Sequence, residues 1–440
     1  MKIAVVGCGP RAVAIAAQCA ALKAIGITPP SVTIFEKNNA LSAWSGDASF
    51  SDGLSLLCTS IERDVGYPYA RSGSGKEEVL LSQFSWRAYL TTNLAFGSLE
   101  LNDWFSRGRP QPSHSEYVGY LSWALNRARE SGGIELIERK DVVSIGFTEA
   151  DRWTLSARSL NGTITDYPGF DGVVITGLGP RSDSIFKGKN PLFFNGLDFW
   201  QTDRKKALLS KIDGNLEAKE DFSVVIAGDG GTSAAISAFL IGTKRRNIEI
   251  TIIGSNPFLD SRPTNFFSDR MFGNSDAWEQ LPVAAKHEFL KRTSSGRIWL
   301  QVARELEACP YLHYQCSRVT NADYNSLSDE VGYFRVNCRT EDLGSSYLTA
   351  DALVDARGFD SLWFLPLFER KFRNLLAPFP NQPGSTGRYL QKCLDQNLNV
   401  KIDGFPDGLH IPMLGSLVNP ASSNLMALGS IAETIVQKYI

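Results

Sequence analysis

MKIAVVGCGPRAVAIAAQCA, residues 1–20, is the stretch that predicts the fold of this chain. It begins with a short apolar run rich in β-branched residues (2–6), turns at Gly7-Cys8-Gly9-Pro10 and continues as an Ala-rich segment (11–23). A second apolar run, SVTIF, follows at 31–35. Because parallel strands need a crossover helix between them, this order predicts a βαβ unit and therefore an α/β fold.

The turn Gly7-Cys8-Gly9-Pro10-Arg11-Ala12 matches the dinucleotide-binding pattern G-x-G-x-x-A. Gly7 permits the tight turn, Gly9 lets the backbone approach a pyrophosphate, and Ala12 allows close helix–strand packing. The helix N-terminus then offers free N–H groups to the phosphates. Glu36 ends the second strand, where a carboxylate accepts both ribose hydroxyls and repels a 2′-phosphate. The first site therefore favours FAD or NAD over NADP, and the spacing of Glu36 argues against a turn that holds no ligand.

A second strand–turn–helix pattern, SVVIAGDGGTSAAISAFL, begins at residue 223. Its turn, Gly228-Asp229-Gly230-Gly231-Thr232-Ser233, matches G-x-G-x-x-S, and the following strand ends at Ile253-Gly254-Ser255 without an acid. Basic residues occur nearby in the sequence, at 244–246 and at Arg262. This site would tolerate a 2′-phosphate, so we expect NADPH here. A solvated loop is the simpler interpretation of 244–246, which leaves Arg262 as the stronger phosphate candidate.

Composition narrows the function further. The 440 residues suffice for two or three domains, and 45 basic against 47 acidic residues give a net charge of −2. There is no basic surplus for nucleic acid or anionic lipid, and no apolar stretch approaches the roughly 20 residues that span a bilayer. We expect a small-molecule substrate and a cytoplasmic protein without a signal peptide; homo-oligomerisation is left open.

Two dinucleotide sites in one chain indicate a hydride relay in which NADPH reduces a flavin. The seven cysteines show neither C-x-x-C nor C-x4-C spacing, which argues against a disulfide reductase. A monooxygenase needs no protein redox group, since the C4a-hydroperoxyflavin itself carries the oxygen. The cysteine pattern therefore favours a monooxygenase that uses O2.

We expect two Rossmann-like dinucleotide-binding domains, for FAD and NADPH, with a helical substrate-side region. Strand–turn pieces at 172–180 and 351–359 flank the second unit, which predicts an inserted domain. The expected division is an FAD domain at 1–190 with a helical segment at 82–130, an inserted NADPH domain at 191–345, and a return to the FAD domain at 346–440.

More specific motifs extend beyond the glycine turns. They include TSIERDVGYPY (59–69), FSWRAYL (84–90), WFSRGRPQPSH (104–114), VVITGLGP (173–180) and LVDARGFD (353–360). In these the chain resembles, nearly end to end, the flavin-dependent N-hydroxylating monooxygenases that act on lysine or ornithine side-chain amines in siderophore biosynthesis. It is most similar to the mycobactin-type lysine N-hydroxylases. The resemblance implies FAD- and NADPH-dependent N-hydroxylation of a primary amine, with L-lysine or a lysine derivative as the leading substrate.

The resemblance also implies roles for single residues. Cys58 and Arg63 would touch the flavin ring, and Arg63 is the candidate catalytic cation where the family commonly has Lys. Trp44 would pack near the flavin, Val142 would offer its backbone to the adenine, and 419–428 would cover the isoalloxazine; core packing is an equally good interpretation of these three. The predicted cofactor residues are Gly7, Gly9, Pro10, Arg11, Ala12, Glu36, Lys37, Trp44, Cys58, Val142, Gly177, Gly228, Gly230, Gly231, Thr232, Ser233, Arg262, Gly358, Asn424 and Leu425. The predicted substrate residues are Cys58, Asp269 and Ser294, and no metal site is predicted.

The chain departs from the ornithine hydroxylases at several positions. Thr92 aligns with their carboxylate-binding Lys, Thr293-Ser294-Ser295 replaces T-N-Y, and Phe267-Ser268-Asp269-Arg270 replaces F-x-N-E. These changes argue against free ornithine and leave lysine, an acylated lysine or a diamine. Arg357 also replaces the Thr of an A-T-G turn. Two other functions stay open: an NADPH-dependent flavin reductase or oxidase that releases peroxide without an amine substrate, and a nucleotide-sensing protein without enzymatic activity.

Overall fold

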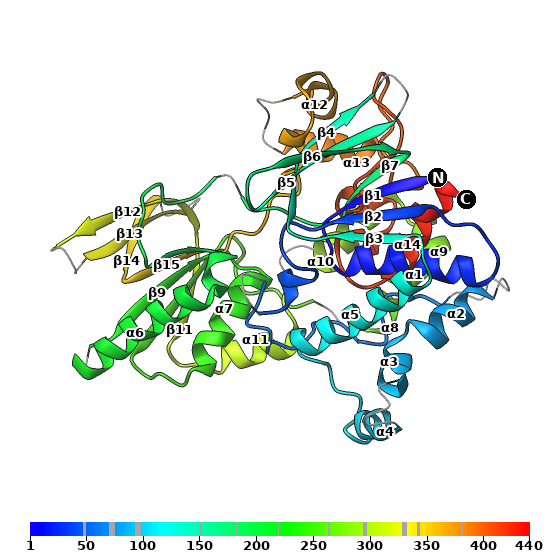
Figure 1. Cartoon of the computed structure of the whole chain (residues 1–440). Helices are drawn as coiled ribbons and strands as arrows, with labels where there is room; N and C mark the ends of the chain where they lie inside the picture. Colours follow the sequence, from blue (N-terminus) through cyan, green and yellow to red (C-terminus); the bar gives the residue numbers. More distant parts are fainter. Residues whose placement is uncertain are drawn as a thin grey trace.

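Strand β1 (Lys2–Val6) lies at the centre of a five-stranded parallel sheet with the order β16-β7-β1-β2-β3 (Figure 1). The computed structural model describes residues 1–46, 50–69, 75–92, 98–148, 152–181, 183–218, 220–262, 265–293, 297–327, 332–340, 344–379, 382 and 384–440. The other strands of this first sheet are β2 (Ser31–Phe35), β3 (Ile134–Ile137), β7 (Gly172–Ile175) and β16 (Leu409–His410). The predicted βαβ unit is confirmed: β1 and β2 pair in parallel, and α1 (Pro10–Ala24) connects them.

Helices cover one face of this sheet. The Ala-rich α1 packs on α5 (His114–Glu130) and α14 (Leu428–Val436), because its small side chains let neighbouring helices approach closely. The helical pattern expected at 82–130 corresponds to α2 (Lys76–Gln83), α3 (Trp86–Thr92), α4 (Ser98–Ser106) and α5. Its aromatic residues Trp86, Tyr117 and Tyr120 are buried in the core, so packing is their role here.

The opposite side of the first lobe carries a three-stranded antiparallel sheet, β4 (Lys140–Phe147), β5 (Trp153–Ser159) and β6 (Ile164–Phe170). The short strands and turn signals of residues 134–167 predict an antiparallel meander, which is confirmed for β4, β5 and β6, whereas β3 joins the parallel sheet instead. The return segment adds α12 (Arg370–Leu376) and α13 (Ser385–Lys392) to this lobe (Figure 1).

The second lobe is built on another five-stranded parallel sheet, with the order β11-β10-β9-β15-β8. Its strands are β8 (Phe193–Asn195), β9 (Phe222–Ala227), β10 (Ile248–Gly254), β11 (Leu312–Cys316) and β15 (Ala352–Asp355), with α6 (Thr202–Ala218), α7 (Gly231–Gly242) and α11 (Leu300–Glu307) around it. A β12-β13-β14 meander (Arg318–Ser326, Gly332–Thr340 and Gly344–Ala350) completes the lobe. The α/β fold with two Rossmann-like sheets is thereby confirmed.

One strand assignment is corrected by the pairing. The strand expected to return to the first sheet at 351–359 is β15, which pairs with β9 and β8 of the second sheet. Its apolar sequence fits either buried parallel sheet, so the local pattern could not decide between them. The chain therefore leaves the second sheet after Asp355, later than the boundary expected at 345.

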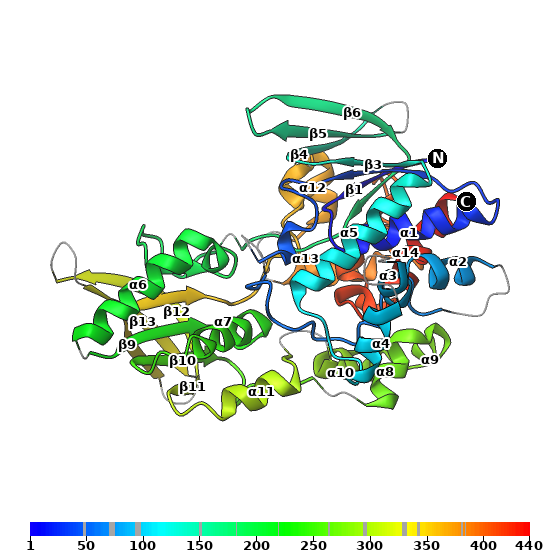
Figure 2. The same cartoon turned by 60° about the horizontal axis from the view of Figure 1, so that its bottom comes forward.

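A helical excursion from the second lobe reaches the first. Helices α8 (Phe266–Gly273), α9 (Ser275–Glu279) and α10 (Val283–Thr293) lie between β10 and β11 in sequence but beside the first lobe in space (Figures 1 and 2). Phe272 and Phe289 pack into the core around α1, and the Trp278 Nε1–H donates to the Leu417 carbonyl at 3.1 Å. The second-lobe segment thus supplies part of the first lobe's lower face.

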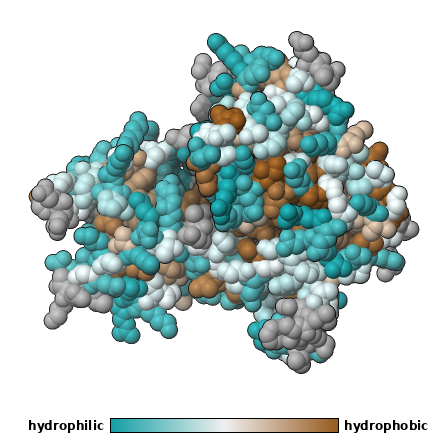
Figure 3. Space-filling model, in the orientation of Figure 1, coloured by the Kyte–Doolittle hydropathy of each residue, from teal (hydrophilic) through white to brown (hydrophobic). Residues whose placement is uncertain are grey.

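The surfaces of the two lobes differ. In Figure 3 hydrophilic colour dominates the lobe of β9–β15, and hydrophobic colour gathers in the middle of the other lobe. Among the helices that the structure describes, none combines the length and the hydropathy needed to cross a bilayer.

His410 connects the edge of the first sheet to the C-terminal segment and is completely buried. Its Nδ1 lies 2.8 Å from the Asn397 carbonyl and its Nε2 lies 2.7 Å from the Tyr439 hydroxyl. Burial lowers the pKa of His410 to about 4, below its ordinary value of 6.5. The unfolded chain therefore binds the proton first as the pH falls, and stability present above pH 6.5 is lost between pH 6.5 and 4.

We expect His410 to contribute about 2 kcal/mol to the loss of unfolding free energy between pH 7 and pH 5. Urea unfolding at both pH values tests this. His410→Gln should flatten the pH dependence by that amount, while His287→Gln, at an exposed site, should leave it unchanged. Equal pH dependence in the wild type and both variants would contradict the assignment.

Candidate functional site

The first glycine turn joins β1 to α1 with the backbone that its sequence predicts. Gly7 has φ +95°, and a Cβ there would lie 2.8 Å from the Thr176 Oγ1. Gly9 is the extended N-cap residue of α1, and a Cβ there would meet nothing within 4 Å. Pro10 begins the helix, and Ala12 is a buried residue of its first turn. The turn thus leaves open space in front of a helix N-terminus, which suits an anion.

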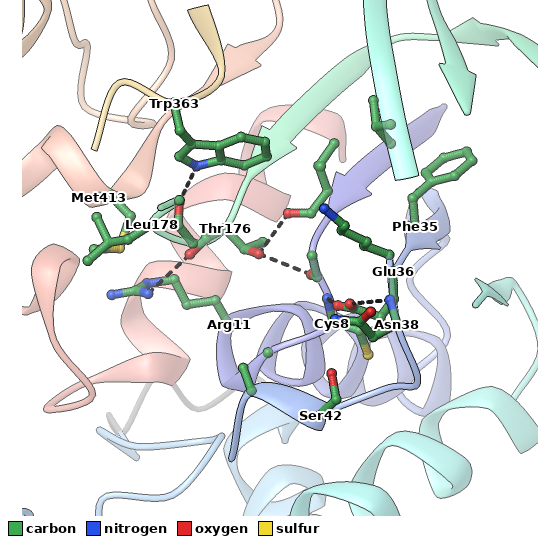
Figure 4. Close-up of a pocket in the computed structure, with 18 of the residues that line it drawn as sticks. Cys8, Arg11, Phe35, Glu36, Asn38, Ser42, Thr176, Leu178, Trp363 and Met413 are labelled. Carbon is green, nitrogen blue, oxygen red and sulfur yellow. Dashed lines mark hydrogen bonds between the residues drawn. The ribbon is translucent and has the colours of Figure 1, made fainter. Parts of the chain in front are cut away.

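A cavity of about 800 Å³ opens beside this turn, at the carboxyl ends of β1, β2 and β7 (Figure 4). The carboxyl edge of a parallel sheet is where α/β proteins bind ligands. The predicted cofactor residues in its wall are Gly7, Gly9, Pro10, Arg11, Glu36, Lys37, Trp44, Val142, Gly177, Asn424 and Leu425. The fold therefore gathers residues from both ends of the chain around one cavity.

Glu36 is held firmly at the edge of the turn. One carboxylate oxygen accepts the Cys8 N–H at 2.8 Å and the other accepts the Asn38 N–H at 2.9 Å. Each oxygen keeps a second acceptor position, so the carboxylate can also accept ribose hydroxyls. Figure 4 shows Glu36 beside Cys8 at the cavity. Burial, with Glu36 next in effect, raises the pKa of the Cys8 thiol to about 12, so Cys8 adds no charge to this wall.

Arg11 supplies a positive charge beside the glycine turn, and Lys37, Lys140 and Arg158 also line the cavity. The Arg11 guanidinium donates to the carbonyls of Thr176 (3.1 Å), Ser422 (2.7 Å) and Asn424 (3.1 Å), and its Nε has no partner among the described residues. Burial lowers the pKa of Arg11 to about 10, which still leaves the side chain charged at neutral pH. Carbonyls do not neutralise a buried cation, so this wall favours an anionic group such as a pyrophosphate. The residues present thus fit the FAD expected here.

A second group of charged residues lies on the other side of the C-terminal segment. Ser423, Asn424 and Leu425 line the cavity, and the next residue, Met426, contacts Thr59, Arg63 and Arg262 through its sulfur. Met426 thus connects the cavity wall to the predicted catalytic Arg63.

The Arg63 side chain is mostly buried and pairs with Asp269, a predicted substrate residue on α8, at 3.2 Å. Arg63 also lies over the Tyr67 ring at 5.5 Å, and Arg262 lies over the Phe272 ring at 5.6 Å. The structure thus brings Arg63 together with Arg262 and Asp269, which lie about 200 residues further along the chain. We call these three residues the Arg63 cluster.

Two predicted substrate residues have different outcomes. Cys58 is exposed and lies near Arg262 of the Arg63 cluster. Desolvation raises the pKa of its thiol, and the Arg262 charge lowers it to a smaller extent. Ser294 lies outside the residues that the structure describes.

The second glycine turn repeats the geometry of the first. Gly228 has φ +121°, and a Cβ there would clash with the backbone of Ala356. Gly230 is the extended N-cap of α7, and the buried Ser233 donates its hydroxyl to the Gly228 carbonyl. Gly231 and Thr232 form the first turn of α7, where a Cβ on Gly231 would meet nothing within 4 Å. The open space at this helix N-terminus fits a second pyrophosphate.

The basic residues expected near this second turn lie elsewhere. Residues 244–246 follow the C-terminal end of α7, so they lie at the opposite edge of the sheet from the turn, and Arg245 pairs with Asp213 at 2.6 Å. The Arg262 side chain contacts Met426 and Phe272, and so lies with Arg63 and Asp269 in the Arg63 cluster. Helix α7 begins at the second glycine turn and ends beside residues 244–246, so its length separates these residues from the turn although they are close in sequence.

Some residues that shape the site escaped the sequence analysis. Thr176 donates its hydroxyl to the Val6 carbonyl at 2.8 Å and accepts from Arg11, so it fixes the turn. The Trp363 Nε1–H donates to the Gly177 carbonyl at 2.9 Å in the cavity wall. Met426 joins the cavity wall to the Arg63 cluster; it lies within the segment 419–428 that was expected over the isoalloxazine, but was not singled out there.

Arg357, the unusual residue of the Ala356-Arg357-Gly358 turn, has a structural role. Its guanidinium donates to both carboxylate oxygens of Asp355, at 2.8 and 2.9 Å, and to the Asp183 carbonyl. Gly358 follows with φ +98°. The two segments that cross between the lobes also pair directly, through Gly179 and Asp360 at 2.8 and 3.0 Å. Arg357 therefore ties the end of β15 to the other crossing segment.

We expect Arg357→Thr to lower the unfolding free energy by about 2 kcal/mol, because it leaves the Asp355 carboxylate buried without a cation. Urea unfolding of the apo-protein measures the change. Arg245→Thr removes an arginine of the same lobe whose partner, Asp213, is exposed to solvent. This variant should leave the unfolding midpoint unchanged. Equal shifts for the two variants would argue against this role for Arg357.

No protein-family model matches the chain. Over 443 residues the chain is 29% identical to the L-lysine N6-monooxygenase MbtG of Mycolicibacterium paratuberculosis (strain ATCC BAA-968 / K-10), with 99% of this chain and 94% of the relative covered. It is 28% identical over 442 residues, with the same coverage, to the protein of that name from Mycobacterium tuberculosis (strain ATCC 25618 / H37Rv). These matches confirm the resemblance described from the motifs.

Solved structures agree with the fold. Lysine monooxygenase NbtG from Nocardia farcinica superposes with a TM-score of 0.75 at 25% identity, covering 99% of this chain and 98% of that one. The Kutzneria sp. 744 ornithine N-hydroxylase KtzI gives a TM-score of 0.74 at 19% identity and the same coverage, which shows the shared fold alone. The two-lobed architecture is therefore that of full-length flavin N-hydroxylases.

Proposed function

From this full-length similarity to lysine N6-monooxygenases, we propose that the protein is an FAD- and NADPH-dependent monooxygenase that N-hydroxylates a primary amine. The leading substrate is the side-chain amine of L-lysine or a lysine derivative, with O2 as co-substrate, in the biosynthesis of a siderophore or a related natural product. The observation that carries the proposal is the cavity at the first glycine turn, connected through Met426 to the Arg63 cluster. A flavin site and a charged substrate site would then share one boundary.

The first lobe has the groups that FAD needs. The α1 N-terminus and Arg11 offset the pyrophosphate charge, and the carboxylate of Glu36 accepts ribose hydroxyls. When bound, FAD would supply hydride acceptance from NADPH and oxygen activation. Trp44, Leu367 and Leu425 give the cavity apolar walls that exclude water.

The Arg63 cluster can prepare the amine. An alkyl amine has a reference pKa near ~10.4, so at neutral pH almost all of it is protonated and unreactive as a nucleophile. Arg63 and Arg262 together outweigh the single negative charge of Asp269. A net positive surrounding disfavours a further cation and lowers the pKa of an amine placed beside it. The cluster would thereby favour the neutral amine that reacts with activated oxygen.

We also propose the domain division given above, with its last boundary moved past Asp355, so that the NADPH domain includes β15. The cytoplasmic location is proposed as well, since all seven cysteines are free in the structure and a reducing compartment suits them.

An amine panel tests the function. The purified protein, loaded with FAD, is given NADPH and O2 with L-lysine, an Nα-acylated lysine, L-ornithine or 1,5-diaminopentane. We expect hydroxylamine product with lysine or its derivative, in proportion to the NADPH consumed. NADPH loss that is the same with every amine, with all oxygen recovered as peroxide, would identify a flavin oxidase instead. Absence of NADPH oxidation under all conditions would identify a protein without this activity.

A further inference from the structure

Strand β10 ends without an acidic residue, but the side chain of Asp229 lies at this strand end. Asp229 follows Gly228 directly, at the carboxyl end of β9, and its Oδ2 accepts the Asn256 N–H at 3.1 Å and the Asn256 Nδ2–H at 2.8 Å. The Tyr314 hydroxyl on β11 lies 3.4 Å from the same oxygen. Gly254, the last residue of β10, makes room for this arrangement, because a Cβ there would clash with the Asp229 side chain.

This position is where a dinucleotide-binding sheet recognises the adenosine ribose. In this type of site an acid near the end of the second strand accepts the ribose hydroxyls, whereas a 2′-phosphate needs a nearby cation. Asn256 lies just beyond β10, the second strand here, and holds Asp229 against that strand end. An acid supplied from the glycine turn thus stands close to where an acid supplied by β10 would stand.

The bonding of Asp229 leaves it free to act on a ligand. All the hydrogen bonds it accepts from the described residues fall on Oδ2, so Oδ1 keeps its acceptor positions. Within the described part of the chain Asp229 forms no ion pair, since Arg245 is bound to Asp213 and Arg262 lies in the Arg63 cluster. A carboxylate without a cation beside it opposes a further negative group placed at this corner of the second site.

We propose that Asp229 is a coenzyme-specificity residue that lets the second site accept NADH alongside NADPH. Its free Oδ1 would accept the 2′-hydroxyl of NADH, and its charge would oppose the 2′-phosphate of NADPH. The inference rests on the proposed function, because it assumes that the second glycine turn binds a nicotinamide dinucleotide.

Calorimetric titration of the FAD-loaded enzyme with NAD⁺ and NADP⁺ tests the inference without turnover. For the wild type we expect Kd values that differ by less than about tenfold. Asp229→Asn, which keeps an acceptor for Asn256, should tighten NADP⁺ binding by about tenfold and leave NAD⁺ within about threefold. Asp229→Ser, which removes the charge in a smaller side chain, should shift the preference in the same direction.

Asp213→Asn is the matched control, because it removes an exposed carboxylate from the same lobe beyond the far end of α7. It should change neither Kd. Wild-type binding of NADP⁺ more than 100-fold tighter than NAD⁺, or an unchanged preference in both Asp229 variants, would overturn the inference. The outcome of the amine panel is independent of this titration. If the protein makes no hydroxylamine but shows the expected Kd shifts, the proposed function is refuted and the role of Asp229 is retained.

Discussion

Gly9→Asp is expected to abolish FAD binding while the apo-protein stays as stable as the wild type. Gly9 is the N-cap residue of α1 and has ordinary extended backbone, and a Cβ added there would meet no protein atom within 4 Å. Asp is a preferred N-cap residue, so the unfolding free energy of the apo-protein should rise by about a few tenths of a kcal/mol. The same carboxylate would stand at the helix N-terminus where the pyrophosphate is expected. Repulsion between like charges should raise the Kd for FAD by more than about 100-fold.

The measurement pairs flavin titration, followed by fluorescence quenching, with thermal unfolding of the apo-protein. Gly9→Ala adds the Cβ alone and should weaken binding less than Gly9→Asp. Gly7→Ala is the contrasting control: Gly7 has φ +95° and its added Cβ would crowd Thr176, so this variant should lose stability as well. Unchanged FAD affinity in Gly9→Asp would refute the placement of the pyrophosphate at this turn.

Arg63→Ala is expected to lower the rate of N-hydroxylation about 100-fold at neutral pH while FAD stays bound. Arg63 pairs with Asp269 at 3.2 Å, and its loss leaves that carboxylate facing the site without this partner. An unpaired acid beside the amine stabilises the ammonium form. If the amine pKa rises by about two, the reactive neutral fraction falls about 100-fold.

The pH dependence identifies this cause. Product formation by Arg63→Ala should recover as the pH rises toward the pKa of the amine, and Arg63→Lys should stay within about tenfold of the wild type because it keeps the charge. Arg63→Ala combined with Asp269→Asn should be more active than Arg63→Ala alone, since the unpaired acid is gone. A double variant no better than the single one would show that Arg63 acts in another way.

The glycine turns and Glu36 could be predicted because their requirements are local. Gly7 and Gly228 adopt positive φ values that favour glycine, and Gly9 and Gly230 begin helices from extended N-caps. The spacing from the first turn to Glu36 follows from one helix and one strand. The α/β class and the first glycine turn with its acid therefore follow from stretches of about 35 residues, the length of one βαβ unit.

The substrate side required long-range contacts. Arg63, the stretch from Arg262 to Asp269, and Met426 are far apart in the chain. They meet because the α8–α10 excursion packs on the first lobe and the C-terminal segment returns beside the first turn. The hydrophobic periodicity of a sequence predicts local helices and strands and does not indicate which distant residues come into contact. For the same reason Arg262 was expected at a phosphate and lies instead in the Arg63 cluster.

The sequence by itself determined the two strand–turn–helix units and the acid at the first of them, since the backbone conformation of a turn and the spacing of its acid are decided by neighbouring residues. Only the tertiary structure decided that β15 belongs to the second sheet, that residues 244–246 lie at the far edge, and that Asp229 stands at the end of β10. The physical reason is that a buried apolar strand fits any parallel sheet, and the direction of a side chain at a sheet edge depends on strands paired from distant parts of the chain.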